Sequence, residues 1–173
     1  HYDAPGSPSL AEEAAALLRD AGIASSSNGC RGIDHGAWVP LRWMYPAADV
    51  PVVQLSVQPG LGTPHHLQMG RALQPLTERD VLVIGSGHVT HNLRDWMTSR
   101  DALQPLPYVS AFSRWLEGHL ARHDEAALLA YREPAPEAAR AHPTEEHFLP
   151  LFVALGAAGS AVTSRRIYSG MEG

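Results

Sequence analysis

The chain has 173 residues, of which 45% are hydrophobic, enough for one domain with a sizeable core. Its formal net charge of −5 excludes the basic footprint that nucleic-acid binding requires, and the absence of lysine excludes Schiff-base chemistry. No stretch is apolar over the roughly 18 residues that a membrane-spanning helix needs.

The first residues predict two helices. Ser9 opens a capping-box pattern, and apolar side chains follow at helical spacing, so we expect a helix over residues 9–21 that ends near Gly22. Residues 41–45 predict a second, short helix, which Pro46 stops.

A strand and a longer helix come next. Residues 50–57 are mostly apolar and β-branched, which is typical of a central strand. Thr63 followed by Pro64 is a good helix start, so we expect a helix over 64–76. Its residues expected to face inward are Leu67, Gly70, Ala72 and Leu73.

The second half begins with the most informative segment of the chain. Residues 81–84 form a short apolar run that leads into Gly-Ser-Gly, which predicts a buried strand and a tight turn. Helices are expected over 92–97, 108–122 and 124–131, with a proline-bearing connection over 99–107.

The last helix is expected over 145–156, capped by Thr144 and ended by Gly156. Strands that alternate with helices favour an α/β fold, with a mostly parallel central sheet flanked by helices in a single domain.

Three histidines occupy settings that suggest chemistry. His91 follows the Gly-Ser-Gly turn, and ligands bind beyond the carboxyl ends of strands in open α/β sheets. His35 lies beside Asp34, whose carboxylate could orient its imidazole. His147 is expected near the start of the last helix, where the helix dipole favours neutral imidazole, the form that binds metal or accepts a proton.

Other polar residues have simpler interpretations. His88 is expected to be a loop residue that points elsewhere, and Glu145 and Glu146 to be partners of the helix dipole. The remaining histidines expected at the surface or at a helix end are His65, His66, His119 and His123. The single cysteine, Cys30, cannot form an internal disulfide, which fits a cytoplasmic protein.

Four motifs occur in a fixed order along the chain: Asp34-His-Gly-Ala-Trp-Val-Pro-Leu-Arg42, Pro51-Val-Val-Gln-Leu-Ser56, Ile84-Gly-Ser-Gly-His-Val-Thr-His-Asn-Leu93 and Glu146-His-Phe-Leu-Pro-Leu151. Together they resemble the class III extradiol ring-cleavage dioxygenases of the LigB type, in the 4,5-DOPA dioxygenase-like branch. The resemblance covers nearly the whole chain.

The resemblance implies an α/β enzyme that uses non-haem Fe(II) and O₂ to open a catechol-type ring. It implies that His147 is a metal ligand, that His91 is an acid/base group or a further ligand, and that His35 is a second-sphere or proton-transfer group. Zn(II) could occupy the same site without supporting turnover.

The resemblance also implies that something is missing. The family takes its first two metal histidines from N-terminal motifs that this sequence lacks, and the end at Gly170–Gly173 is early. We therefore expect residues 1–173 to be the C-terminal two-thirds of one catalytic domain, truncated at both ends. The sequence leaves open whether the chain is the ordered part of a longer protein, a fragment, or a descendant that lost the metal centre.

Two functions compete on these grounds. The first is extradiol cleavage of a catechol, with no nucleic-acid or membrane partner. The alternative is a non-catalytic interaction protein on the same scaffold, which the missing ligands favour and the retained histidines oppose. Zinc-dependent hydrolysis has no supporting motif. The sequence specifies neither the catechol nor the oligomeric state.

Overall fold

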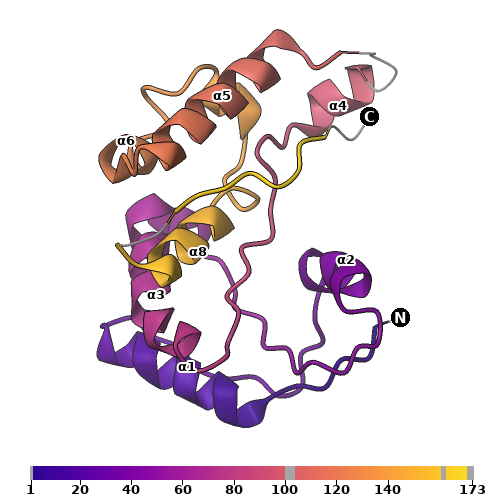
Figure 1. The fold of residues 1–173 in the computed structure, drawn as a ribbon, viewed down its shortest axis with the longest axis vertical. Helices are drawn as coiled ribbons and strands as arrows, with labels where there is room; N and C mark the ends of the chain where they lie inside the picture. Colours follow the sequence, from indigo (N-terminus) through magenta and orange to yellow (C-terminus); the bar gives the residue numbers. More distant parts are fainter. Residues whose placement is uncertain (1, 100–103, 161–162, 171–173) are drawn as a thin grey trace. The chain divides into compact units, whose positions relative to one another are not determined.

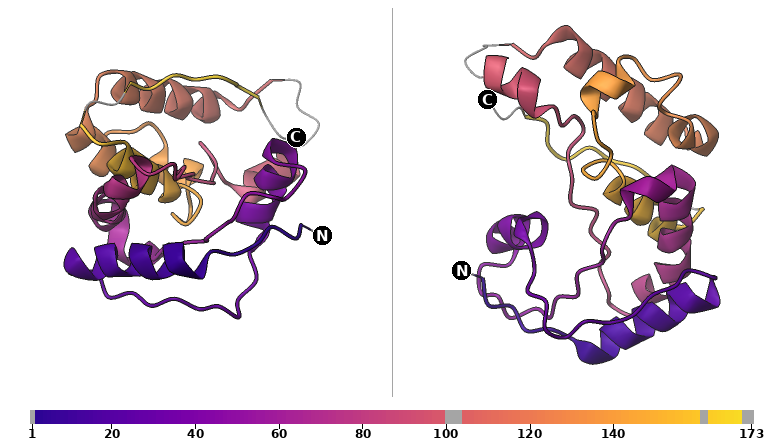
Figure 2. Two further views of the ribbon diagram at one scale, coloured as in Figure 1. Left: turned by 60° about the horizontal axis from the view of Figure 1, so that its bottom comes forward. Right: turned by 180° about the vertical axis from the view of Figure 1, so that it is seen from behind.

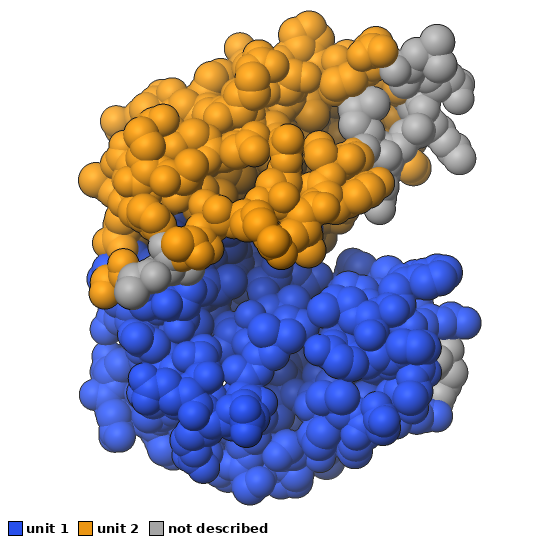
Figure 3. Space-filling view, viewed as in Figure 1, with its two compact units in different colours: residues 1–87, 149–159 blue, residues 88–148, 160–173 orange. Residues whose placement is uncertain are grey.

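The computed structural model describes residues 2–99, 104–160 and 163–170, and its contacts divide the chain into two compact units. Unit 1 comprises residues 1–87 and 149–159, and unit 2 comprises residues 88–148 and 160–173 (Figure 3). The predicted connection over 99–107 lies partly outside the described residues. None of the helices in the described ranges is long and apolar enough to cross a membrane.

Unit 1 is built around two helices in close contact. Its elements, in chain order, are α1 (Pro8–Asp20), α2 (His35–Met44), the short 3₁₀ helix η1 (Pro59–Leu61), α3 (Gly62–Thr77) and α8 (Pro150–Ala158). Helices α3 and α8 lie side by side although more than seventy residues separate them in the sequence (Figures 1 and 2).

The core of unit 1 joins α1, α3 and α8. Its buried residues are Leu18, Ile23, Met69, Leu73, Leu76 and Val153. The predicted inward face of the 64–76 helix is confirmed for Leu67, Gly70 and Leu73, which are buried in α3.

Glycines allow α3 and α8 to approach so closely. A Cβ atom on Gly70 would lie 2.1 Å from the Val153 carbonyl oxygen, and one on Gly156 would lie 2.3 Å from the Leu67 carbonyl oxygen. The sequence predicts that Gly156 ends the last helix, and this prediction is wrong. Gly156 lies within α8, which continues to Ala158 and ends at Gly159, a residue with a φ of 77°.

The prediction of a mostly parallel central sheet is wrong for the described residues. The only pairing there is a single parallel bridge between Gly6 and Val52, and neither 50–57 nor 81–84 forms a strand. Val81 and Val83 do pack against the unit 1 core, while Leu82 and Ile84 are exposed. The run has the alternation of a strand, but no described neighbour exchanges a ladder of backbone hydrogen bonds with it.

Two helix starts also differ from the expectation. Asp34 caps α2 by accepting the Gly36 N–H, so this helix begins at His35 and not at residue 41. The last helix begins at Pro150 because proline is favoured at the first helical position, and residues 146–149 form turns before it.

The described residues of unit 2 form four helices and an aromatic core. The helices are α4 (Leu93–Ser99), α5 (Pro107–Ala121), α6 (Glu125–Leu129) and α7 (Ala138–Ala141). Phe112 of α5 is fully buried and contacts the rings of Tyr131, His142 and Phe148 edge to face. His142 and Phe148, which follow α7 in the sequence, are therefore part of this core.

Candidate functional site

Two of the three predicted site histidines are in contact in unit 2. The imidazole rings of His91 and His147 stack with their centroids 3.7 Å apart and their planes at 28°. His91 comes from the segment that precedes α4, and His147 from the turns that precede α8. Helices α4 to α7 separate the two residues in the sequence, so the folding of unit 2 brings them together.

Two further side chains complete the cluster. One ligand atom from each of His91, Glu146 and His147 lies within 4.8 Å of the others, the arrangement of a candidate metal site. The ring centroid of His88 is 5.4 Å from that of His91 and 5.8 Å from that of His147. All four side chains belong to unit 2.

Backbone hydrogen bonds fix the two segments that carry the cluster. The His88 N–H donates to the His147 carbonyl oxygen at 2.9 Å, and the His91 N–H donates to the Ala141 carbonyl oxygen at 2.8 Å. Within unit 1, a Cβ on Gly85 would lie 2.5 Å from the Pro150 carbonyl oxygen, so the backbone at Gly85 passes directly over the start of α8. The tight turn predicted for Gly-Ser-Gly is wrong, because residues 85–87 are irregular backbone with no turn.

The charges of the cluster suit a cation. Burial lowers the pKa of His91, and its neighbours His147 and His88 lower it further, against the opposite effect of Glu146. Burial raises the pKa of Glu146, but the Thr144 hydroxyl, which donates to its carboxylate at 2.8 Å, the backbone N–H of Glu146, and the imidazoles of His147 and His91 together outweigh burial and lower the pKa. At neutral pH the cluster therefore offers the neutral imidazole of His91 and the carboxylate of Glu146.

Sequence reasoning missed half of this cluster. Glu146 was expected to interact with a helix dipole, but it precedes α8 by a full turn and lies 3.9 Å from the Nε2 atom of His147. His88 was expected to point elsewhere, yet its ring joins those of His91 and His147. The spacing of three between His88 and His91 was the available signal.

His35 is the third predicted site residue, and it belongs to unit 1. It is the first residue of α2 and is exposed. The expectation that Asp34 orients its imidazole is not met, because the Asp34 carboxylate accepts hydrogen bonds from the Gly36 N–H at 3.0 Å and from Gln54 Nε2 at 2.6 Å. The role of His35 stays a prediction.

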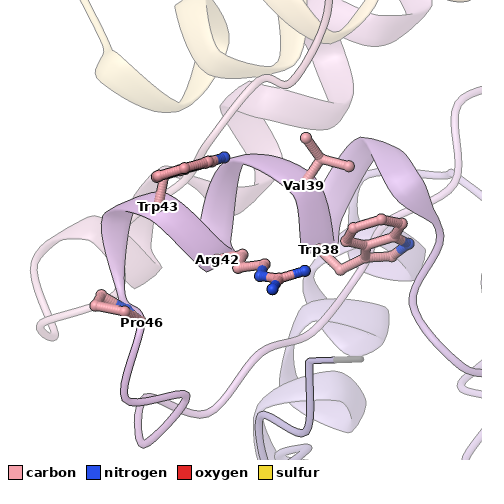
Figure 4. Close-up of a pocket in the computed structure, with 5 residues that line it drawn as sticks. All are labelled: Trp38, Val39, Arg42, Trp43 and Pro46. Atoms are coloured by element: carbon pink, nitrogen blue, oxygen red, sulfur yellow. The ribbon is translucent and has the colours of Figure 1, made fainter.

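Helix α2 also carries a hollow of about 530 Å³ (Figure 4). Its lining residues are Trp38, Val39, Arg42, Trp43 and Pro46. Trp43 is 85% exposed, whereas sites for small molecules usually enclose most of the ligand surface. The hollow is therefore an open apolar surface with one guanidinium, and we assign no ligand to it.

Two histidines expected at the surface are less exposed than predicted. His66 is fully buried in α3, where its Nε2 accepts the Gln58 N–H and its Nδ1–H donates to the Gly62 carbonyl oxygen. His119 is part-buried, lies beside the ring of Trp115 and pairs with Asp124 at 2.9 Å. Both are bonded within the fold, so neither is a candidate ligand. Cys30 is free and exposed.

His142 gives a prediction for acid stability. Burial lowers its pKa to about 4, and Arg132, His91 and His147 add to that effect against the Val89 hydrogen bond. Because the unfolded chain binds this proton near pH 6.5, the folded state loses stability as pH falls below that value. We expect a loss of about 2 kcal/mol between about pH 7 and pH 5 from this group.

The measurement is denaturant unfolding of the wild type and of His142→Phe at both pH values. The variant has no imidazole to protonate, so its stability is expected to fall less than that of the wild type over this range. Equal losses in the two proteins would contradict the prediction.

Comparison with known proteins identifies the family. The family model for the catalytic LigB subunit of aromatic ring-opening dioxygenase matches residues 1–173, which is the entire chain. The chain belongs to the LigB family.

Two relatives, one from Beta vulgaris and one from Escherichia coli K12, have the same name. The chain is 44% identical to a 4,5-DOPA dioxygenase extradiol of Beta vulgaris, covering 99% of this chain and 64% of the relative. It is 36% identical to a protein of the same name from Escherichia coli K12, covering 91% of this chain and 58% of that one. The LigB chain thus spans less than two thirds of the length of each of these two relatives.

A solved structure supports the fold. The LigB chain resembles the crystal structure of an uncharacterized Escherichia coli K12 protein with a TM-score of 0.77 and 35% sequence identity. The match covers 91% of this chain and 64% of that one.

Proposed function

We propose that this LigB chain is part of an extradiol dioxygenase that opens a catechol-type ring with O₂. The observation that carries the proposal is the cluster of His91, Glu146 and His147, whose ligand atoms lie within 4.8 Å of one another. The membership of the whole chain in a family of ring-opening dioxygenases supports it.

The donor types of this cluster fit Fe(II). Two imidazoles and one carboxylate that leave other positions open are typical of non-haem Fe(II) oxygenases, although the same donors also suit Zn(II). His91 has a lowered pKa and Glu146 is ionised, so neither must lose a proton at neutral pH before it binds. When bound, Fe(II) brings catechol and O₂ together and makes their otherwise slow reaction possible.

The balance of the reaction requires no further reactant. Both atoms of O₂ enter the product, and the ring carbon–carbon bond beside one hydroxyl breaks. The catechol hydroxyls must lose protons to bind the metal, so a neutral imidazole within reach is useful. We propose His91, Glu146 and His147 as ligands, and a ring nitrogen of His88 as the proton acceptor, because His88 borders this set without belonging to it.

The sequence also allows His91 itself to move the proton. Two variants separate these roles: His88→Gln and His91→Gln. If His91 is a ligand, His91→Gln weakens metal binding, whereas His88→Gln retains the metal and loses turnover. If His91 is the acid/base group, His91→Gln retains the metal and loses turnover.

The proton-transfer role of His35 has its own test. His35→Gln removes the imidazole at the start of α2 and keeps a polar side chain there. A proton-transfer role predicts a fall in kcat of about 100-fold or more with unchanged iron content. Wild-type turnover in this variant would remove His35 from the mechanism.

The test of the proposed function is anaerobic loading of the protein with Fe(II), followed by a catechol panel that includes DOPA. We expect O₂ uptake in one-to-one proportion to substrate and the appearance of a yellow semialdehyde product. Zn(II)-loaded protein is the control and should consume no O₂. Absence of O₂ uptake across the panel, together with failure to retain iron, would favour the non-catalytic interaction protein instead.

A further inference from the structure

The segment that carries His88 and His91 is bound at four points to the segment 140–147. Two are backbone bonds, from the His88 N–H to the His147 carbonyl oxygen and from the His91 N–H to the Ala141 carbonyl oxygen. The third is donated by the Asn92 side chain to the Arg140 carbonyl oxygen at 2.8 Å. The fourth joins the His142 Nε2 atom to the Val89 carbonyl oxygen, also at 2.8 Å.

The fourth bond differs from the others because its donor is a buried side chain. His142 has no exposed surface, and its ring packs against Phe112 and Phe148 with centroid distances of 5.5 and 4.6 Å. Its Nε2 must carry the proton, because a carbonyl oxygen can only accept. Its Nδ1 is then an acceptor, and it is buried with no hydrogen-bond partner among the described residues.

A histidine at this place stabilises the aromatic core less than a phenylalanine would, unless its Nε2–H makes a hydrogen bond that the fold needs. A buried acceptor without a donor costs on the order of 1–3 kcal/mol, which a phenyl ring in the same place would avoid. The one polar contact that a phenyl ring could not make is the bond to Val89. Val89 lies between His88 and His91. Its side chain is half exposed, so the hydrogen bond from His142 to its carbonyl oxygen is what connects this residue to the aromatic core.

We propose that His142 is a positioning residue: by holding the Val89 carbonyl, it fixes the backbone between His88 and His91 and thereby sets the His91 imidazole against that of His147. The inference rests on the proposed metal site of His91, Glu146 and His147. A displacement of about 1 Å at a reacting or binding group can cost as much as 100-fold in rate, so loss of this bond affects the site without any contact between His142 and a ligand.

Two variants of His142 separate positioning from packing. His142→Gln retains a side-chain N–H that can reach the Val89 carbonyl, whereas His142→Phe fills the aromatic core and donates nothing. Phe112→Leu is the matched control, because it loosens the same core and leaves the Val89 bond in place. All three are compared with the wild type in the complete chain.

The first readout is Co(II) affinity, measured by titration of the visible absorption of the bound ion. We expect His142→Phe to bind Co(II) about tenfold more weakly or worse, and His142→Gln to stay within about threefold of the wild type. Phe112→Leu is expected to lower the melting temperature and leave Co(II) affinity unchanged. With iron and a catechol, His142→Phe should lose kcat while KM changes little.

Several results would overturn the inference. Wild-type Co(II) affinity in His142→Phe would do so, as would equal losses in the Gln and Phe variants. If His142→Phe does not fold, long-range ¹H–¹⁵N spectra of the wild type decide the matter, because a proton on Nδ1 would rule out the bond to Val89. If the wild type cleaves no catechol and His142→Phe still loses Co(II), the proposed function fails and the positioning role stands.

Discussion

Replacing His147 by alanine is expected to abolish metal binding and to lower ring cleavage by more than about 100-fold, beyond the range typical of residues that merely support a ligand. The side chain of His147 lies within 4.8 Å of both other members of the candidate metal site and stacks on one of them. Its removal leaves one imidazole and one carboxylate of the candidate set.

The measurement combines iron content after anaerobic loading with O₂ uptake in the presence of a catechol. His123→Asn is the matched control, since His123 is an exposed histidine of the same unit with a φ of 54°, a conformation that asparagine tolerates. The control should retain iron and turnover. Full iron content in His147→Ala would show that the metal is held elsewhere.

Replacing Gly70 by alanine is expected to lower the free energy of unfolding by about 3 kcal/mol, the upper end of the usual cost of overpacking. The added methyl group would lie 2.1 Å from the Val153 carbonyl oxygen and 2.9 Å from the Ala157 nitrogen. Both atoms belong to the backbone of α8, so the contact is relieved only if the two helices separate. Separation would expose the core that they share with α1.

Denaturant unfolding followed by circular dichroism measures this effect. Gly60→Ala is the control, because a Cβ at Gly60 meets nothing within 4 Å. That variant should unfold within about 0.5 kcal/mol of the wild type, as most changes at unconstrained sites do. Equal stability of the two variants would mean that α3 and α8 pack less closely than described.

The sequence predicted helices better than sheet pairing, and the reason is physical. Helix hydrogen bonds are local, so the start and end of α5 and the inward face of α3 follow from nearby residues. A strand needs a partner that sequence pattern does not specify. The 81–84 run has the right residues and the right alternation of burial, but the described residues provide no ladder beside it.

Some residues of the candidate site were predicted from the sequence, and others were missed. His91 and His147 were both singled out, and their rings are in contact. Glu146 was missed because its expected role assumed a helix that begins five residues too early, whereas Pro150 delays the start of α8. The place of His142 could not be predicted either, because its bond to Val89 joins residues more than fifty positions apart.

The long interval between His91 and His147 has a consequence for heat resistance. The two rings are neighbours only in the folded chain, because α4 to α7 lie between them in the sequence, so we expect a divalent cation to bind the native chain far better than the unfolded one. Mass action then makes the melting temperature rise with the concentration of free cation. At a free cation concentration one hundred times the dissociation constant, the free energy of unfolding increases by about 2.7 kcal/mol. Thermal scans with and without a chelator would detect metal even where no substrate is known.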